Sequence, residues 1–119
     1  MASQLAYLYL EHGGDVNVAL SLAQLASQRM PRSPEVADTL GWAYYRLGVP
    51  ASAVVQLEEC VQKVPGNPVF QYHLGMAYMA AGRFGFAQRS LQRALKESPS
   101  FPFAASARAA LEKIARLPR

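Results

Sequence analysis

The sequence contains few of the residues that build covalent or metal-bound frameworks. Among its 119 residues, Cys60 is the one cysteine, and His12 and His73 are the two histidines. A disulfide within the chain is therefore excluded, as is a zinc site with several cysteines. No run of about 18 apolar residues occurs, so no segment has the length of a membrane-spanning helix. The first residues, MASQLAYLYLEHGG, lack the basic start and long apolar centre of a secretory signal peptide.

Residue patterns that support catalysis are also missing. His73 has no acid, serine or cysteine at a local triad spacing, so we expect a partly exposed histidine on a helix. The glycine-containing segments GGD at 13–15 and GRFGF at 82–86 are not phosphate-binding loops, because no G-K-[ST] follows them. Glu58 and Glu59 are adjacent and point to different faces of a helix, so they are not a paired-acid site. We therefore expect no enzyme activity, no cofactor and no metal.

The positive charge of the chain is concentrated in its C-terminal third. The formal net charge is +4, and eight of the twelve basic residues lie from Arg83 onward. Arg89, Arg93 and Lys96 follow the spacing of one outer stripe of a helix, which favours an ordinary solvated face. A surface for nucleic acid or an anionic membrane is the other interpretation. It would use five basic residues: Arg83, Arg89, Arg93, Lys96 and Arg108.

A repeat of 34 residues organises the chain. Shifting the sequence by 34 gives nine identities, which are Pro34/Pro68, Leu40/Leu74, Gly41/Gly75, Ala43/Ala77, Tyr44/Tyr78, Gly48/Gly82, Ala53/Ala87, Leu57/Leu91 and Pro65/Pro99. A weaker first copy has Leu5, Ala6 and Tyr9 at an offset of 35, so one extra residue lies near 13–14. Such an insertion is tolerated in a turn. Cys60 occupies the slot of two alanines, which predicts a small buried core residue.

Each repeat is predicted to form two helices. Prolines fit the first turn of a helix and cannot continue one, whereas glycine accepts the left-handed conformation that ends it. The predicted helices are about 34–47, 50–63, 68–81 and 84–97, with an earlier helix from an Asp15 cap to about Arg29. Gly41 and Gly75 lie inside helices, where glycine costs about 1 kcal/mol, so we expect a neighbouring helix to pack closely on them.

A different pattern closes the chain. Ala104, Ala107, Leu111 and Ile114 share one apolar helix face, and a charged stripe with Glu112 at its centre lies opposite. We expect this helix, at about 102–117, to cap the array, with ion pairs from Glu112 to Arg108 and Arg116. The predicted units are therefore residues 1–33, 34–67, 68–101 and the cap, within one domain.

The spacing L-G-x-x-Y, then G, A-x-x-x-L and P resembles the tetratricopeptide repeat, a helix–turn–helix unit. It is carried by two matching sets of residues: Leu40, Gly41, Tyr44, Gly48, Ala53, Leu57 and Pro65, and Leu74, Gly75, Tyr78, Gly82, Ala87, Leu91 and Pro99. The resemblance covers residues 3 to about 101. It implies an all-α fold, a right-handed superhelix (α-solenoid) of about seven helices, and a non-catalytic role in protein–protein interaction.

A narrower resemblance concerns the segments LAYLYLEHGGDVNVALSLAQLA, DTLGWAYYRLG and YHLGMAY. They are similar to the C-terminal repeats of large bacterial tetratricopeptide proteins. Some of these accompany exopolysaccharide synthesis and the PEP-CTERM/exosortase sorting system, often as envelope lipoproteins. The resemblance implies a bacterial protein, the cell envelope more than the cytoplasm, and a segment of a longer array.

In tetratricopeptide arrays the first helix of each pair lines a concave groove. Asp38, Trp42 and Tyr45 form one such stripe beside Gly41; the same slots hold Tyr72, Met76 and Met79 in the next repeat, and Ser3, Tyr7 and Leu10 in the first. The predicted groove residues are Tyr7, Leu10, Asp38, Trp42, Tyr45, Arg46, Tyr72, Met76, Met79 and Phe103. Aromatic and methionine side chains suit an apolar peptide or partner helix.

Two alternatives to this groove remain open. The stripe residues could instead pack sideways on neighbouring first helices, or meet another copy of the chain as a self-association surface. The carboxylate clamp that some family members use for chaperone C-termini needs lysine, arginine and asparagine. The corresponding slots here hold Tyr7, Trp42, Tyr72 and Met76, which makes that ligand a poor fit.

Overall fold

The computed structural model describes residues 2–118, with side chains from residue 4 onward. Seven helices make up the described part, and no strand occurs in it. They are α1 (Ala2–Glu11), α2 (Val16–Arg29), α3 (Pro34–Leu47), α4 (Pro50–Lys63), α5 (Pro68–Ala80), α6 (Phe84–Glu97) and α7 (Ala104–Ala115). The predicted helix boundaries are confirmed to within about two residues, as good as such boundaries can be defined.

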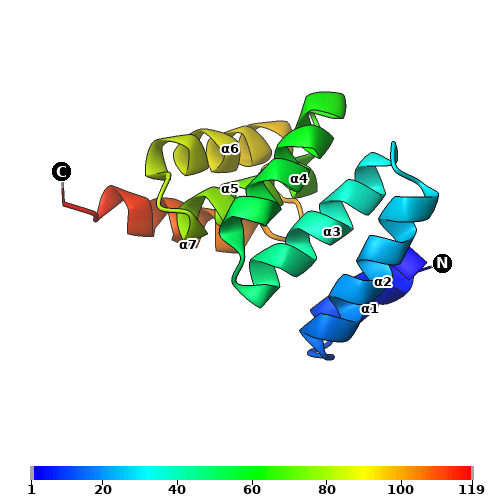
Figure 1. Cartoon of the computed structure of the whole chain (residues 1–119). Coiled ribbons are helices and arrows are strands. Elements are labelled where there is room, and N and C mark those ends of the chain that lie inside the picture. The colour runs from blue at the N-terminus through cyan, green and yellow to red at the C-terminus, as the bar shows by residue number, and fades with distance from the viewer. Residues whose placement is uncertain (1, 119) are drawn as a thin grey trace.

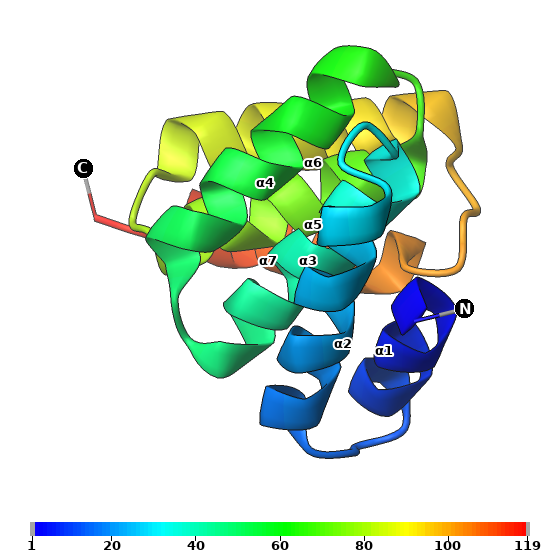
Figure 2. The same cartoon turned by 45° about the vertical axis from the view of Figure 1, so that its right-hand side comes forward.

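The helices stack in chain order into an elongated superhelix of 41 × 25 × 23 Å (Figure 1). Each first helix packs against its own second helix, and each second helix packs against the first helix of the next repeat. The first helices α1, α3 and α5 also contact one another in sequence. The turned view shows α1 and α2 at one end of this stack, away from α6 (Figure 2).

Helix starts and stops follow the local chemistry of proline, polar caps and glycine. Pro34, Pro50 and Pro68 each lie in the first turn of a helix. The Asn67 side chain accepts hydrogen bonds from the backbone N–H groups of Val69 and Phe70 at 2.9 and 3.1 Å, which satisfies donors at the start of α5. Gly48 ends α3 with a φ of 87°, the left-handed region that glycine enters at little cost.

Close packing within a helix pair depends on the glycine inside each first helix. A Cβ atom on Gly41 would lie 2.6 Å from Leu57 Cγ, and one on Gly75 would lie 2.7 Å from Leu91 Cγ. The predicted close approach is therefore confirmed. The first repeat has Ala6 in place of the glycine, and Ala23 in the leucine slot. Both are fully buried. Compared with the later repeats, the first helix gains a methyl group and the second helix loses the larger part of a leucine side chain, so the interface stays filled.

Tyrosines connect each repeat to the one before it. The Tyr44 hydroxyl accepts a hydrogen bond from the Gln24 amide of α2 at 3.4 Å. One repeat later, the Tyr78 hydroxyl donates to the Glu58 carboxylate of α4 at 2.5 Å. Gln24 and Glu58 are themselves 34 residues apart, so the polar contact recurs with the same period as the helices.

The terminal helix covers the last repeat, as predicted. Ala104, Ala107 and Ala110 are buried against the core, with Leu111 and Ile114 packed at its edge. The two ion pairs predicted for Glu112 do not form among the described residues, and that prediction was wrong. The Arg108 guanidinium instead donates to the Pro99 carbonyl at 2.6 Å, because the turn before α7 leaves that acceptor within reach.

Candidate partner-binding groove

The predicted groove residues lie at very different depths. Tyr7, Tyr45, Met76, Met79 and Phe103 are half-buried and Arg46 is exposed. Leu10, Asp38, Trp42 and Tyr72 are buried, with no more than 7% of their surface exposed. Ser3, the first slot of this stripe, lies outside the residues whose side chains are described. We use the term groove face for the surface of α1, α3 and α5, with Phe103, that carries these residues.

An aromatic stack lies beneath the groove face. Trp42 stacks on Tyr45 at 4.5 Å between ring centroids, and on His73 at 4.1 Å. Tyr72 stacks on Phe103 at 5.2 Å, with Phe101 at its edge. Trp42 thus packs sideways onto the neighbouring first helix α5, the alternative that the sequence left open, and Tyr72 packs onto the turn before α7. Offset and edge-on ring pairs of this kind hold the helices at a fixed spacing.

A buried polar pair joins α3 to α5. His73 Nδ1 lies 2.7 Å from Asp38 Oδ1, with His73 fully buried and the Asp38 side chain 8% exposed. The expectation of a partly exposed histidine was wrong, because the contact is between repeats and no local spacing reveals it. Asp38 and His73 are 35 residues apart, so the repeat period places them on adjacent first helices. That period was the available signal.

Two buried nitrogens near this pair have no hydrogen-bond partner among the described residues. They are Trp42 Nε1 and His73 Nε2, on two rings that stack on each other. Buried side-chain polar atoms are mostly paired, so each is a notable exception. The indole N–H can only donate, whereas the imidazole nitrogen opposite the Asp38 contact can accept when the ring is neutral. Together they suit a small group that both accepts and donates, such as a hydroxyl.

Two tyrosines of the groove face, Tyr7 and Tyr72, stay protonated at neutral pH. Burial, and then the charges of Glu11 and Asp38, raise the pKa of Tyr7 from 10.0 to about 12. Burial also raises the pKa of Tyr72. Both side chains therefore present neutral phenols, which can donate a hydrogen bond without adding charge to an apolar surface.

Arg46 has a structural contact as well as an exposed position. Its guanidinium donates to the carbonyl oxygen of Leu10 at 2.9 Å, near the C-terminal end of α1. A cation at a helix C-terminus satisfies a free carbonyl and interacts favourably with the helix dipole. Arg46 therefore fixes α3 against α1 at the edge of the groove face.

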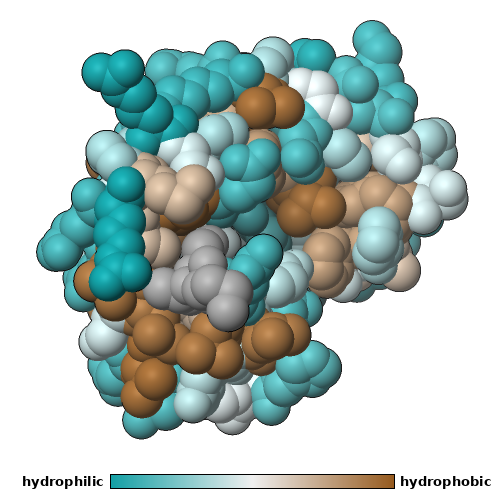
Figure 3. Space-filling model, turned by 90° about the vertical axis from the view of Figure 1, so that its right-hand side faces the viewer, coloured by the Kyte–Doolittle hydropathy of each residue, from teal (hydrophilic) through white to brown (hydrophobic). Residues whose placement is uncertain are grey.

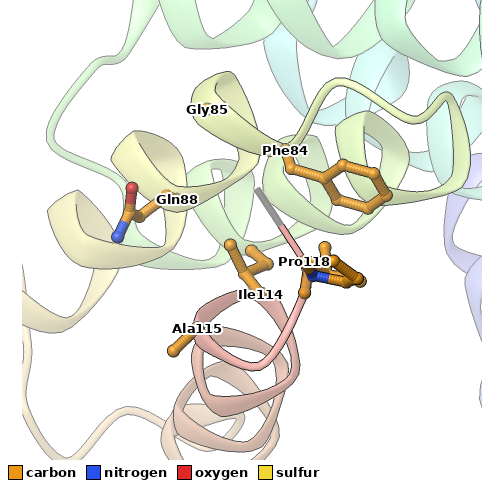
Figure 4. A pocket seen from close by; sticks show the side chains of 7 residues that line it. Phe84, Gly85, Gln88, Ile114, Ala115 and Pro118 are labelled. Atoms are coloured by element: carbon orange, nitrogen blue, oxygen red, sulfur yellow. The ribbon is translucent and has the colours of Figure 1, made fainter.

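Hollows lie beside the groove face and at the far end of the molecule. One of about 440 Å³ is lined by Gln4, Tyr7, Leu8, Glu35 and Thr39, between α1 and α3. Another of about 320 Å³ lies between the start of α6 and the end of α7 with the residues that follow it. Figure 4 shows Phe84 from α6 facing Ile114 and Pro118 across it. Gln88 is the one polar side chain in that lining, so it offers little chemistry.

Four of the five basic residues considered for a nucleic-acid or membrane surface already have partners within the chain, namely Arg83, Arg89, Arg93 and Arg108. Arg83 and Arg89 each lie 4.6 Å from the centre of the Phe86 ring. Arg93 forms an ion pair with Glu97 at 2.7 Å, as i, i+4 neighbours on α6. These contacts place the guanidinium groups on the surface of α6, in the arrangement expected of a solvated helix face.

The described residues contain no group of three or more histidine, cysteine or acidic side chains placed to hold a metal ion. Cys60 is buried and unpaired, as its slot in the repeat predicted. None of the helices in the described range has the length and hydropathy needed to cross a membrane.

Three solved structures illustrate what the fold is similar to. The first tetratricopeptide domain of Spaghetti (RPAP3), bound to the HSP90 peptide SRMEEVD, superposes with a TM-score of 0.82 at 21% identity, covering 97% of this chain and 88% of that one. PcrH in complex with the chaperone binding region of PopD gives 0.79 at 19% identity, covering 96% and 88%. A MamA D159K mutant gives 0.72 at 28% identity, covering 97% and 67%.

A comparison with curated protein sequences gives no match. The family model described as tetratricopeptide repeat matches residues 48–113, which is more than half of the chain. Together with the repeat period, the helix pairs and the packing of Gly41 and Gly75, this match shows that the chain belongs to the tetratricopeptide repeat family.

Proposed function

We propose that this protein is a non-catalytic interaction module that binds a peptide or a partner helix along the groove face. The observation that carries the proposal is the row of half-exposed Tyr7, Tyr45, Met76, Met79 and Phe103 above a buried aromatic stack. Two of the similar structures support it, since one holds a bound peptide and the other a partner's binding region.

The physical basis is a rigid floor with adaptable side chains above it. Trp42 and Tyr72 are fixed by stacking, and the Asp38–His73 contact ties α3 to α5. Met76 and Met79 add flexible, polarisable contacts that adjust to different apolar side chains. A ligand would therefore gain from a preformed surface, which lowers the entropic cost of binding. The absence of basic side chains at the clamp positions favours an apolar ligand over an acidic chain terminus.

The test combines selection of a ligand with two substitutions on the exposed part of the groove face. Peptides would be selected on the immobilised chain from a random library displayed on phage. We expect the selected peptides to be rich in apolar residues and to bind the Tyr45→Ala/Met76→Ala variant at least about tenfold more weakly, a loss of about 1.4 kcal/mol. Isothermal titration calorimetry measures the affinity.

Val55→Ala is the matched control, because Val55 is 62% exposed on the outer helix α4. The affinity of the Val55→Ala variant for the same peptides should equal that of the unmodified chain. Unchanged binding by Tyr45→Ala/Met76→Ala, with the fold intact by circular dichroism, would reject the groove face as the binding site.

The other functions predicted from the sequence have weaker support. Binding of nucleic acid or an anionic membrane would use Arg83, Arg89 and Arg93, whose guanidinium groups already contact Phe86 or Glu97. The narrower resemblance to exopolysaccharide-associated bacterial proteins, and an envelope location, remain predictions. Self-association remains a prediction as well, and light scattering over a concentration series would test it.

A further inference from the structure

The outer side of α1 exposes apolar side chains that lie outside the groove face. Leu5, Leu8 and Tyr9 are 46%, 52% and 36% exposed. With His12 and Gly14 they line a hollow of about 340 Å³. Figure 3 looks at the molecule from the end where α1 lies and shows hydrophobic residues gathered over its lower half. We call the surface formed by Leu5, Leu8 and Tyr9 the α1 face.

The first two of these slots are buried in both later repeats, and the tyrosine slot is half-buried at Tyr44 and buried at Tyr78. Leu5, Leu8 and Tyr9 correspond to Leu40, Ala43 and Tyr44, and then to Leu74, Ala77 and Tyr78. Leu40 and Leu74 are 5% and 4% exposed, and both alanines are fully buried. In each case the second helix of the preceding repeat packs against the helix that carries these slots, α2 against α3 and α4 against α5, and it makes a hydrogen bond to the tyrosine. The chain itself therefore shows what kind of element covers these slots.

The covering helices share a simple pattern. In α4, Val54 and Val61 belong to the cluster that contains Leu74 and Tyr78, and Glu58 between them accepts from the Tyr78 hydroxyl. In α2, Leu20 precedes Gln24 by four residues, and Gln24 donates to the Tyr44 hydroxyl. In both cases, therefore, the tyrosine-bearing helix is contacted by a helix face that carries an apolar residue and, four positions later, a glutamine or glutamate.

The Tyr9 hydroxyl is available for the same kind of hydrogen bond to a glutamine or glutamate. This hydroxyl has no hydrogen-bond partner among the described residues, although a tyrosine hydroxyl can both donate and accept. The Tyr9 ring lies directly on Gly14, where a Cβ atom would come within 2.3 Å of Tyr9 Cδ1. A side chain at position 14 would therefore displace the ring, so glycine keeps it in place beside Leu5 and Leu8.

We propose that the α1 face binds an amphipathic helix of a partner protein, with an apolar residue at one position and a glutamine or glutamate four positions later that pairs with the Tyr9 hydroxyl. The internal contacts of α2 on α3 and α4 on α5 are the template, and the α1 face continues that series of interfaces. Leu8 is larger than the alanines at its counterparts, so the bound helix needs small residues where it approaches Leu8. The second helices of a folded second copy already use the matching face on their own neighbours, so they do not supply this helix.

The probe is a fluorescent peptide that copies residues 15–29, the α2 helix with its Asp15 cap, because it combines Leu20 and Gln24 with several alanines. The full chain is titrated into the peptide, and fluorescence anisotropy reports binding. We expect Leu8→Glu in the chain, or Leu20→Glu in the peptide, to weaken binding at least about tenfold. Tyr9→Phe should weaken it about three- to tenfold, as loss of one hydrogen bond does.

Two controls separate this surface from others. Val55→Glu places the same charge on an exposed valine of α4, and binding should be unchanged. Tyr45→Ala/Met76→Ala alters the groove face and should also leave peptide binding unchanged, so failure of the proposed groove and failure of the α1 face can be told apart. Leu8 is half-exposed, so Leu8→Glu should keep the helical circular dichroism spectrum.

The proposal is overturned if the peptide shows no binding up to about 1 mM, the limit of a specific weak contact. It is also overturned if Leu8→Glu binds the peptide as well as the unmodified chain does. A third contrary outcome is a dimer by sedimentation that Leu8→Glu converts to a monomer, because the α1 face would then serve self-association.

Discussion

The Asp38–His73 contact shows that a residue predicted to face the groove can instead be a buried structural residue. Asp38 occupies a slot that tetratricopeptide arrays turn toward a groove, yet its side chain is 8% exposed and lies 2.7 Å from His73 Nδ1. When Asp38 is ionised its carboxylate only accepts, so Nδ1 carries the proton and the ring is held in one orientation. The contact thereby also fixes the ring on which Trp42 stacks.

Removal of the Asp38 carboxylate should destabilise the fold strongly. We expect Asp38→Ala to lower the free energy of unfolding by about 1–3 kcal/mol, because it leaves the His73 nitrogen buried without a partner. Urea denaturation followed by circular dichroism measures this change.

The comparison is Asp38→Leu with His73→Phe, which replaces both partners by apolar groups and keeps a ring against Trp42. That double variant should cost less than Asp38→Ala alone. A loss below about 1 kcal/mol for Asp38→Ala would show that the pair has no structural role.

At this scale, periodicity predicts which face a residue occupies but not how deep it lies. Trp42 and Tyr45 share a stripe, yet Trp42 is 7% exposed and Tyr45 is half-buried. The difference comes from His73 on α5, whose ring stacks on Trp42. Contacts between repeats depend on pairs of side chains, and no single helix pattern contains that information.

At the scale of the helix, the distance between partners is set by a pair of complementary volumes. Gly41 and Gly75 oppose leucines, whereas Ala6 opposes an alanine in the first repeat. A leucine against an alanine would overfill the interface, and an alanine against a glycine would leave a void. Each pair thus combines a small residue with a partner of matching volume, so the first copy can depart from the repeat at both positions together.

A double-mutant cycle on α5 and α6 tests this explanation. Gly75→Ala should lower the free energy of unfolding by about 1–3 kcal/mol, because its Cβ atom would lie 2.7 Å from Leu91 Cγ. Leu91→Ala should cost about 2–5 kcal/mol. The double variant reproduces the alanine pair of the first repeat, so its loss should be at least about 1 kcal/mol smaller than the sum.

Gly85→Ala is the control for this cycle, since a Cβ atom there meets nothing within 4 Å. Better helix propensity should make that substitution neutral or stabilising by up to about 1 kcal/mol. Additive losses for Gly75→Ala and Leu91→Ala would contradict the volume argument.

The helices themselves were predicted well because residues close in sequence determine where each helix begins and ends. Proline at the start, glycine at the stop and Asn67 or Asp15 as a cap act on adjacent backbone groups. The ion pairs of Glu112 were predicted by the same local reasoning and are absent, because Arg108 finds a carbonyl on the preceding turn instead. Exposed ion pairs contribute little free energy, so a nearby acceptor readily displaces them.

At the scale of the whole molecule, stability is distributed along a line of neighbouring interfaces. The helices contact their neighbours in the stack, and α7 packs on α6 at the end of the series. In such an array the energy is close to a sum of repeat and interface contributions, so a defect remains local. Ala107 is fully buried in α7, so a substitution there tests whether a defect in the last helix remains local.

Ala107→Glu should detach α7 without unfolding the rest of the chain. Burial of a carboxylate against α6 is costly, so α7 should open and expose the apolar side of the last repeat. Hydrogen exchange should accelerate in α7 and then in α6, while α1 to α3 keep their protection.

Ala109→Glu, at an exposed position of the same helix, should change none of these rates. Uniform loss of protection from α1 to α7 in Ala107→Glu would instead show that the chain unfolds as one cooperative unit.

The contact between Arg46 and the Leu10 carbonyl has a consequence for how the chain is made. It spans 36 residues, and the Asp38–His73 contact spans 35. Both contacts are therefore complete once the first helix of the next repeat has been synthesised. Translation proceeds at about 5–20 residues per second, far more slowly than helices form. The chain can thus acquire its native order on the ribosome, one repeat after another, without waiting for its C-terminus.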